Sequence, residues 1–389
     1  MSDSATVSQR GAQRWERGHP WIFKSDVKKR PTVPAGAVRV RDDRGRWLGV
    51  ALWSPSSEIS LRLLDQEPDA VVDGRWWMDR LSRAVERRTG AGLDAVTNAY
   101  RVVHAEGDGL PAMICDRYDR WLVVQLLSAG VESFRDVIVE SLVKLTGAEG
   151  VLARHDVPVR SRESLPRETV LLHGDVPREV VVNEHGVRYA AAPWSGQKTG
   201  AFLDQRENRV LLGNLARGRA LDCFSYHGSF ALHLALRADQ VIAVDSSAEA
   251  IERAKANFTL NGFTNGEFVE ANAFDYLRDR DRAGDRFDTI ALDPPAFAKT
   301  RDSLEAALRG YHEINLRAMR LLAAGGVLYT ASCSYHLTRS LFLEMIERAA
   351  EDSGRRLVLR QVLGQPVDHP EILAIPETGY LKGAILQAD

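Results

Sequence analysis

Polar residues stand at the ends of five apolar runs in the second half of the chain. These runs are rich in Val, Ile and Leu, and they lead into Asp222, Asp245, Asn272, Asp293 and Cys333. Helical patterns separate the runs, which predicts a parallel sheet, and in such sheets ligands bind at the edge formed by the carboxyl ends of the strands. The sequence therefore predicts one crevice lined by carboxylates, an amide and a thiol.

The first two of these runs favour a nucleoside cofactor. A carboxylate such as Asp245 can accept hydrogen bonds from both ribose hydroxyls, and Gly228 allows the backbone to approach a ligand closely. A dinucleotide site would require the G-x-G-x-x-G pyrophosphate loop, whereas the segment FSYHGSF has a single glycine. We therefore expect S-adenosylmethionine rather than a dinucleotide.

Asp293, Pro294 and Pro295 form a stiff turn after the fourth run. At a strand end, such a turn can hold a carboxylate and backbone carbonyls against the polar edge of a flat heterocycle. The same three residues elsewhere would be an ordinary rigid turn. Their position at the predicted crevice favours a contact with a nucleobase.

Cys333 is the third chemical signal. A thiolate that adds to C6 of a pyrimidine makes C5 nucleophilic enough to attack a sulfonium methyl group, whereas methylation of an exocyclic amine needs no thiol. A lone cysteine at a strand end is more often a small buried apolar residue, which is what we expect of Cys115 and Cys223. The residues alone leave both interpretations of Cys333 open.

The elements that position these residues can be predicted from hydrophobic spacing. Beyond residue 219, alternating strands and helices predict an open, mostly parallel sheet, closed by an antiparallel pair, RLVLRQVL and YLKGAILQ. Alternation in 36–64 predicts a small antiparallel β-module, and 69–90 predicts a linker helix. Between them and the sheet lies an α+β segment, with strands at 111–115 and 121–127 and a helix at 131–145.

Composition excludes several classes of protein. The chain has 389 residues, 44% hydrophobic and 27% charged, which excludes a disordered or collagen-like protein and predicts two or three domains. Three scattered cysteines, without C-x-x-C or H-E-x-x-H spacing, predict neither a disulfide framework nor a metal site. No apolar leader and no membrane span are recognisable, so we expect a cytoplasmic protein.

The net charge of −2 hides a basic N-terminal region. Residues 1–64 contain twelve lysines and arginines against six acids. Such an excess is equally compatible with a solvated surface and with a patch that contacts phosphates.

An ordered set of motifs gives a resemblance to a known family. FLDQRENR, LDCFSYHGSF, VIAVDSS, ANAFDYL, LDPPAFAK and SCSYH resemble class I S-adenosylmethionine methyltransferases that form 5-methylcytosine in 23S ribosomal RNA. Upstream, RGHPWIFKSDV resembles that family's RNA-binding PUA domain, and HAEGDGLPAMICDRY resembles its central domain. The implied fold class is α/β, with a C-terminal Rossmann-like sheet, an N-terminal β-rich PUA-like domain and a central α+β domain.

The resemblance also implies domain limits and partners. We expect a PUA-like domain at 1–69, a central domain at 70–190 and a methyltransferase domain at 191–389. The expected partner is 23S ribosomal RNA or a large-subunit assembly intermediate, with no membrane, and a homodimer is plausible. RNA contacts are expected from Arg14, Arg17, Trp21 and Lys24.

The same resemblance implies roles for site residues. Cys333 would be the nucleophile, and Asp293 would contact the target base. The residues expected to bind the cofactor are Lys198, Thr199, Phe202, Gln205, Arg206, Asp222, Phe224, Ser225, Gly228, Asp245, Ser246, Asn272, Ala273 and Pro294. Family members usually carry Asp where this chain has Asn272, and Thr-Gly-Gly where it has His227-Gly228-Ser229; we expect His227 to be a spectator.

Two alternatives remain at this point. One is an RNA methyltransferase that acts on a guanine nitrogen or an exocyclic amine, with a structural Cys333. The other is a non-catalytic RNA-binding or ribosome-assembly factor that retains the fold.

Overall fold

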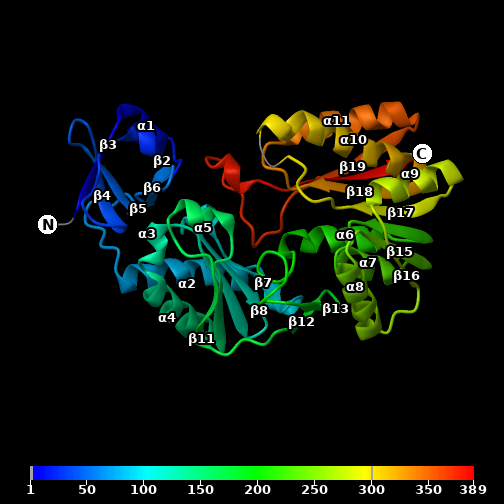
Figure 1. The fold of residues 1–389 in the computed structure, drawn as a ribbon, viewed down its shortest axis with the longest axis horizontal. Helices are drawn as coiled ribbons and strands as arrows, with labels where there is room; N and C mark the ends of the chain where they lie inside the picture. The colour runs from blue at the N-terminus through cyan, green and yellow to red at the C-terminus, as the bar shows by residue number, and fades with distance from the viewer. Residues whose placement is uncertain (1–2, 299–300) are drawn as a thin grey trace. The chain divides into compact units, whose positions relative to one another are not determined.

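The computed structural model describes residues 3–298 and 301–389. Lys299, the last residue of the motif LDPPAFAK, lies outside this part of the chain. The chain forms two compact units (Figure 1). The first comprises Met1–Val182, Ala191–Leu203 and Val367–Thr378; the second comprises Asn183–Ala190, Asp204–Pro366 and Gly379–Asp389. The predicted domain limits stay predictions, because compactness alone does not define a domain.

The first unit begins with a six-stranded sheet of order β2-β6-β5-β4-β1-β3. Its elements are β1 (Ser4–Val7), α1 (Gln9–Glu16), β2 (Trp21–Phe23), β3 (Val27–Lys29), β4 (Gly36–Asp42), β5 (Trp47–Trp53) and β6 (Ile59–Asp65). Strands β4, β5 and β6 pair in antiparallel fashion, as their alternating pattern predicts. Trp15 of α1 packs with Val7 and Ile22 in the core of this module.

A second sheet of the first unit has the order β11-β10-β9-β8-β7. Its elements are α2 (Gly74–Gly90), β7 (Ala99–His104), β8 (Met113–Tyr118), β9 (Trp121–Leu126), α3 (Ala129–Glu132), α4 (Arg135–Thr146), β10 (Gly150–Arg154), α5 (Pro158–Arg162) and β11 (Thr169–Gly174). The predicted strands at 111–115 and 121–127 are present as β8 and β9.

The helix predicted at 69–90 is present as α2, but two details predicted for this region are wrong. The helix is not a linker: it begins after its N-cap Asp73 and buries Trp77, Leu81 and Ala84 in the core of this sheet. It is part of a domain core because its apolar face packs against α4 and β7. The single helix expected at 131–145 is two helices, α3 and α4, which are separated at Phe134 by a non-helical backbone.

The second unit is organised around a seven-stranded sheet of order β16-β15-β14-β17-β18-β20-β19. The strands are β14 (Arg219–Cys223), β15 (Gln240–Asp245), β16 (Gly266–Glu270), β17 (Phe287–Leu292), β18 (Leu322–Ser332), β19 (Leu357–Leu363) and β20 (Lys382–Ala388). The first five are parallel, and β20 is antiparallel to both β18 and β19. Both the predicted parallel sheet and its closing pair are confirmed.

Helices cover both faces of this sheet (Figure 1). They are α6 (Arg206–Leu215), α7 (Ser229–Ala235) and α8 (Ala248–Asn261) on one face, and α9 (Ala273–Ala283), α10 (Leu304–Leu321) and α11 (Arg339–Ser353) on the other. A hairpin of β12 (Val180–Glu184) and β13 (Val187–Ala191) precedes α6. Short 3-10 turns are η1 (Lys24–Asp26), η2 (Leu93–Ala95), η3 (Ala105–Asp108), η4 (Leu203–Gln205), η5 (Arg301–Ser303) and η6 (Pro376–Thr378).

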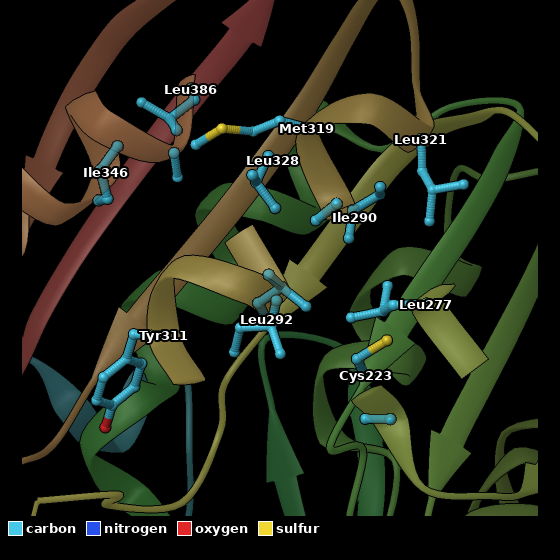
Figure 2. Packing of buried hydrophobic residues seen from close by; sticks show 14 of the residues in the cluster. Cys223, Leu277, Ile290, Leu292, Tyr311, Met319, Leu321, Leu328, Ile346 and Leu386 are labelled. Atoms are coloured by element: carbon cyan, nitrogen blue, oxygen red, sulfur yellow. The ribbon is translucent and has the colours of Figure 1, made fainter. Parts of the chain in front are cut away.

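One core cluster of the second unit lies between the sheet and helices α9 to α11. Figure 2 shows Ile290, Leu328 and Met319 packed in this cluster, with Cys223 at its edge. Cys223 and Cys115 are both fully buried, which confirms the expectation that they are small apolar core residues. Tyr311 lies at one end of the cluster, and its hydroxyl points away from the labelled aliphatic side chains (Figure 2).

The described residues contain neither a membrane-spanning helix nor a cluster of metal ligands. In residues 3–298 and 301–389, no helix has the length and apolar character that crossing a membrane requires. Across the same ranges, no three His, Cys, Asp or Glu side chains group as metal ligands.

Candidate functional site

The candidate site lies at the point where the order of the parallel strands reverses. From β14 the chain proceeds outward to β15 and β16, and it then returns to β17 on the other side of β14. In open α/β sheets the crevice outside the carboxyl ends of two such strands is the usual ligand position. The segments there are the loop 224–228, which follows β14, and the Asp293-Pro294-Pro295 turn, which follows β17.

The backbone of the loop 224–228 is strained. Phe224 and Tyr226 have φ of 63° and 48°, a left-handed conformation that costs a non-glycine residue about 1–3 kcal/mol. Gly228 has φ of 82°, and a Cβ there would lie 3.1 Å from the Cβ of Ala254. The loop is held by the N–H of Ser225, which donates to the carbonyl of Val244 at 3.0 Å. Strained backbone persists only where surrounding contacts maintain it, and such positions cluster at functional sites.

Asp245 fixes the second strand end to this loop. Its Oδ2 accepts from the N–H of Tyr226 and its Oδ1 from the N–H of Ser247, each at 2.9 Å. The residue is half-buried, and Ser246 beside it is exposed. The carboxylate is therefore held by two backbone donors at the carboxyl end of β15.

Asn272 and Ala273 follow the third strand, β16. The Oδ1 of Asn272 accepts from the N–H of Phe274 at 2.9 Å and so caps α9, while Ala273 is buried. An amide oxygen engaged in a cap leaves the amide N–H groups of Asn272 as donors toward a ligand.

Asp222 is a buried carboxylate with incomplete hydrogen bonding. Its Oδ2 accepts from the N–H of Ala231 at 2.9 Å, whereas its Oδ1 has no partner among the described residues. Burial raises the pKa of Asp222 well above its ordinary value. The hydroxyl of Ser225 is likewise buried without a partner in the described part of the chain. Two such oxygens, beside a glycine loop, fit a polar ligand such as S-adenosylmethionine.

Asp293, at the end of β17, is held by an amide. The Nε2 of Gln205 donates to its Oδ1 at 2.7 Å. The Oε1 of Gln205 in turn accepts from the Nδ2 of Asn208 and the hydroxyl of Tyr329, both at 2.7 Å. Gln205, which the resemblance assigns to the cofactor, therefore contacts the carboxylate expected at the target base. Nothing in the spacing of the sequence indicates Asn208 or Tyr329.

The hydroxyl of Tyr311 joins the segment that contains Asp293 to the segment that contains Cys333. It accepts from the N–H of Phe297 at 3.3 Å and from the hydroxyl of Ser332 at 2.9 Å. It also lies 2.9 Å from the hydroxyl of Ser334, which accepts from the N–H of Ala298 at 3.1 Å. Residues 295–298 and 332–334 are thus held side by side, a contact that the sequence does not reveal because Tyr311 lies in mid-helix.

Cys333 is partly exposed between the buried residues Ser332 and Ser334. Lys382 of β20 is 3% exposed, and its Nζ donates to the carbonyls of Ser334 at 2.6 Å and Tyr380 at 2.7 Å. Burial lowers the pKa of Lys382 to about 8. The only sequence signal for this residue is a lysine within the apolar strand YLKGAILQ.

An aromatic cluster lies along the same edge of the sheet. Phe274 and Phe297 have ring centroids 5.7 Å apart, Phe297 and Tyr311 4.5 Å, and Phe224 lies 6.4 Å from both phenylalanines. Pro294 is buried beside Asp293. The cluster connects the first, third and fourth strand ends with an apolar surface suited to flat rings.

Three of the predicted cofactor residues belong to the first compact unit. Thr199 is buried there, and its hydroxyl donates to the Oδ2 of Asp116 at 2.6 Å. The Nζ of Lys198 lies 4.6 Å from the ring centroid of Phe202. Arg206, by contrast, is a fully buried residue of the second unit, and it donates to Glu207 at 2.8 Å. A cofactor role for these four residues stays a prediction.

His227 is buried in the loop, with neither ring nitrogen bonded to a described residue. Its ring packs 5.0 Å from Tyr189 and 4.7 Å from Tyr226, and burial lowers its pKa to about 3. A neutral ring packed between tyrosines is compatible with the expected spectator role.

The residues predicted to contact RNA lie on α1, at its C-cap, on β2 and at the start of η1. Arg14 places its guanidinium carbon 4.5 Å from the ring centroid of Phe23, and Arg17 and Lys24 are exposed. Trp21 is half-buried, and its Nε1 donates to Glu106 at 2.9 Å. The three cations are therefore gathered on one small module.

Comparisons with known proteins agree with this architecture. Residues 5–66 match the PUA-like domain family, and residues 112–382 match the S-adenosylmethionine-dependent methyltransferase family. The chain is 40% identical over 381 residues to ribosomal RNA large subunit methyltransferase I of Aeromonas hydrophila, covering 96% of both chains. It is 37% identical to the protein of that name from Yersinia pseudotuberculosis, covering 94% of both.

Solved structures share the whole fold. A chain described as a SAM-dependent methyltransferase from Streptococcus mutans superposes with a TM-score of 0.83 at 21% identity, covering 99% of both chains. A methyltransferase complexed with SAH gives a TM-score of 0.85 at the same identity and coverage. These similarities confirm the predicted fold class, a PUA-like domain with a Rossmann-like methyltransferase sheet. The chain belongs to the S-adenosylmethionine-dependent methyltransferase family, and it is an enzyme that uses S-adenosylmethionine.

Proposed function

We propose that this enzyme methylates C5 of a cytosine in 23S ribosomal RNA, through a bond between Cys333 and C6 of the target base. The observation that carries the proposal is the Tyr311 hydroxyl, which holds the Asp293-Pro-Pro segment beside the Cys333 segment. The segment that follows Asp293 is thereby held next to the segment that contains Cys333. A carboxylate and a thiol on two such segments suit pyrimidine C5 chemistry, whereas amine methylation needs no thiol.

The names of the relatives support ribosomal RNA as the substrate, and the PUA-like module gives a second reason for an RNA partner. Arg14, Arg17 and Lys24 would contact phosphates, since the charge excess of residues 1–64 is gathered on that module. Free rRNA or a large-subunit assembly intermediate would serve as substrate, in the cytoplasm. A homodimer stays a prediction.

The cofactor would lie over the carboxyl ends of β14 and β15. Asp245 would accept from the ribose hydroxyls, Asn272 would donate to the adenine, and Phe224 would pack on the ring. Ser225, Gly228 and Asp222 would surround the amino acid end, where the unpartnered oxygens of Asp222 and Ser225 need donors. When bound, S-adenosylmethionine supplies the electrophilic methyl group.

The chain's own residues would carry the remaining chemistry. The thiolate of Cys333 forms a bond to C6, and the electron pair of the C5–C6 double bond moves to C5. Asp293 holds N3 of the base, where a proton stabilises the adduct, while Gln205 keeps that carboxylate in place. After C5 has taken the methyl group, a base removes the C5 proton, and the S–C6 bond breaks to restore the ring and the thiolate.

The test is methyl transfer from labelled S-adenosylmethionine into ribosomal RNA from a strain that lacks the corresponding methyltransferase. Wild type and Cys333→Ala are compared, the product nucleoside is identified by mass, and Cys115→Ala serves as the thiol control because Cys115 is fully buried. We expect 5-methylcytidine from wild type and the control, and none from Cys333→Ala, which should still bind S-adenosylmethionine.

Two results would overturn the proposal. A different methylated nucleoside made by both wild type and Cys333→Ala would assign the reaction to another base position, with a structural Cys333. RNA binding without any methyl transfer to ribosomal RNA would leave the protein a binding factor for that RNA.

A further inference from the structure

Lys382 is a buried cation beside the proposed nucleophile. In the antiparallel pair of β18 and β20, Lys382 lies opposite Ser332, and its Nζ reaches the carbonyl of Ser334 at 2.6 Å. Cys333 is the residue between these two serines. The side chain therefore reaches across the end of β18 to the residue that follows Cys333.

The environment of Lys382 favours its charged form in one respect and opposes it in another. Two backbone carbonyls, those of Ser334 and Tyr380, accept from its Nζ, which suits an ammonium group with three donors. Burial acts in the opposite direction and lowers its pKa to about 8. A lysine is rarely as buried as this unless a partner charge compensates it.

Cys333 is the neighbouring ionisable group that favours the charged lysine. Arg339, which is exposed at the start of α11, opposes it as a like charge. Tyr311 contacts the serines on either side of Cys333 in the sequence, and its pKa is raised chiefly by burial and also by the thiolate. Of these groups, the buried lysine is the one that has both a fixed position and a charge opposite to that of a thiolate.

On the basis of the function proposed above, we propose that Lys382 is the positioning residue for the Cys333 thiolate. Its ammonium group, anchored by the carbonyls of Ser334 and Tyr380, holds a positive charge at the thiol and favours ionisation. In that ionisation the S–H bond breaks, the proton passes to water, and the electron pair remains on Sγ. The thiolate so stabilised is the form that attacks C6.

The experiment follows the alkylation rate of Cys333 by iodoacetamide as a function of pH, without RNA or cofactor. Cys115 and Cys223 are fully buried, and a Cys333→Ser protein supplies the background rate. Lys382→Gln removes the charge but retains N–H donors for the two carbonyls, and Lys382→Arg retains the charge. Arg339→Gln is the matched control, because it removes a neighbouring cation that is exposed.

We expect Lys382→Gln to move the alkylation midpoint to higher pH and to slow alkylation at pH 7 about tenfold, the effect of one pKa unit. Lys382→Arg and Arg339→Gln should retain the wild-type midpoint within a few tenths of a unit. A wild-type profile in a folded Lys382→Gln protein would overturn the proposal. If Lys382→Gln does not fold, the alkylation midpoint of Lys382→Arg decides. Arginine keeps the positive charge, so a thiolate stabilised by that charge should keep the wild-type midpoint. A raised midpoint in Lys382→Arg would overturn the proposal.

This readout separates the inference from the proposed function. Alkylation needs neither substrate, so an altered midpoint without 5-methylcytidine formation would refute the cytosine reaction while leaving the ion pair established. With both correct, methyl transfer by Lys382→Gln should be slow at neutral pH and recover as the pH rises.

Discussion

Two sheets of this protein each bury a carboxylate, and the two carboxylates differ in how completely they are hydrogen-bonded. Asp116 of β8 has both oxygens engaged: Arg101 donates to them at 2.7 and 2.9 Å, and Thr199 donates to Oδ2 at 2.6 Å. Asp222 of β14 has one backbone donor, and its second oxygen has no described partner. A buried carboxylate with partners on both oxygens stabilises the structure. A buried carboxylate at a strand end with one oxygen unpartnered lowers the stability of the fold and indicates a ligand site.

The largest effect should come from breaking the completed pair. Asp116→Ala leaves Arg101, which is 7% exposed, without its carboxylate. Loss of one partner from a buried pair costs about 3–5 kcal/mol, so the urea midpoint should fall markedly. Asp136→Ala is the control, because that side chain is fully exposed and should change the free energy of unfolding by no more than about 0.5 kcal/mol. Equal midpoints for the two variants would contradict the comparison.

The carboxyl edge of the seven-stranded sheet can be tested through the affinity of Asp245 variants for S-adenosylmethionine. Asp245→Ala should weaken S-adenosylmethionine binding about tenfold to a hundredfold for each hydrogen bond to the ribose that it removes, since a hydrogen bond to a charged group contributes about 1.5–3 kcal/mol. Calorimetric titration measures the affinity. Asp239→Ala, an exposed carboxylate just before the other end of β15, should bind as wild type does. Unchanged affinity in Asp245→Ala would place the cofactor elsewhere.

Asp222→Asn should raise the free energy of unfolding, whereas Asp116→Ala should lower it. The amide retains an acceptor for the N–H of Ala231 and removes a buried charge, so the free energy of unfolding at pH 7 should rise by about 1 kcal/mol. S-adenosylmethionine binding should weaken in the same protein. A variant that is both less stable and equally able to bind would remove Asp222 from the site.

The pH dependence of stability sharpens this test. The folded-state pKa of Asp222 lies above its ordinary value of 3.8 because of burial. Below pH 3.8 the carboxyl group is protonated in both the folded and the unfolded protein. As the pH rises above 3.8, the unfolded chain releases its proton first, and the wild-type protein loses stability. The advantage of Asp222→Asn should therefore grow from acidic toward neutral pH. An advantage that is constant with pH would exclude ionisation of Asp222 as its cause.

Exposed charges should give the smallest effect, because solvent screens them, whereas Asp116 and Asp222 are buried. Arg17→Ala should leave the urea midpoint unchanged and lower RNA affinity modestly. If Arg17 contacts a phosphate, the slope of log affinity against log salt should decrease by about 0.7–0.9. Glu16→Ala is the neighbouring control and should not flatten the slope. An unchanged slope in Arg17→Ala would locate the RNA footprint away from α1.

Local pattern determined much of this protein. Alternating apolar residues identify β4 to β6, and the strand–helix repeats after residue 219 identify the parallel sheet, because each depends on the side-chain periods of a strand and a helix. The same repeats place Asp222, Asp245, Asn272 and Asp293 at strand ends, since parallel strands share one carboxyl edge. Cys333 is recognisable in the same way, as a thiol that follows a strand.

Tertiary structure decided which side chains face these residues. Gln205 bonds Asp293 across 88 positions, and Lys382 reaches Ser334 across 48, separations that no local period encodes. The expectation of a linker at α2 is wrong because apolar spacing does not say what a helix packs against. The sequence by itself determined the strands, helices and strand-end residues, which follow from backbone periodicity. The fold alone decided the partners of Asp293 and Ser334, which depend on packing between distant segments.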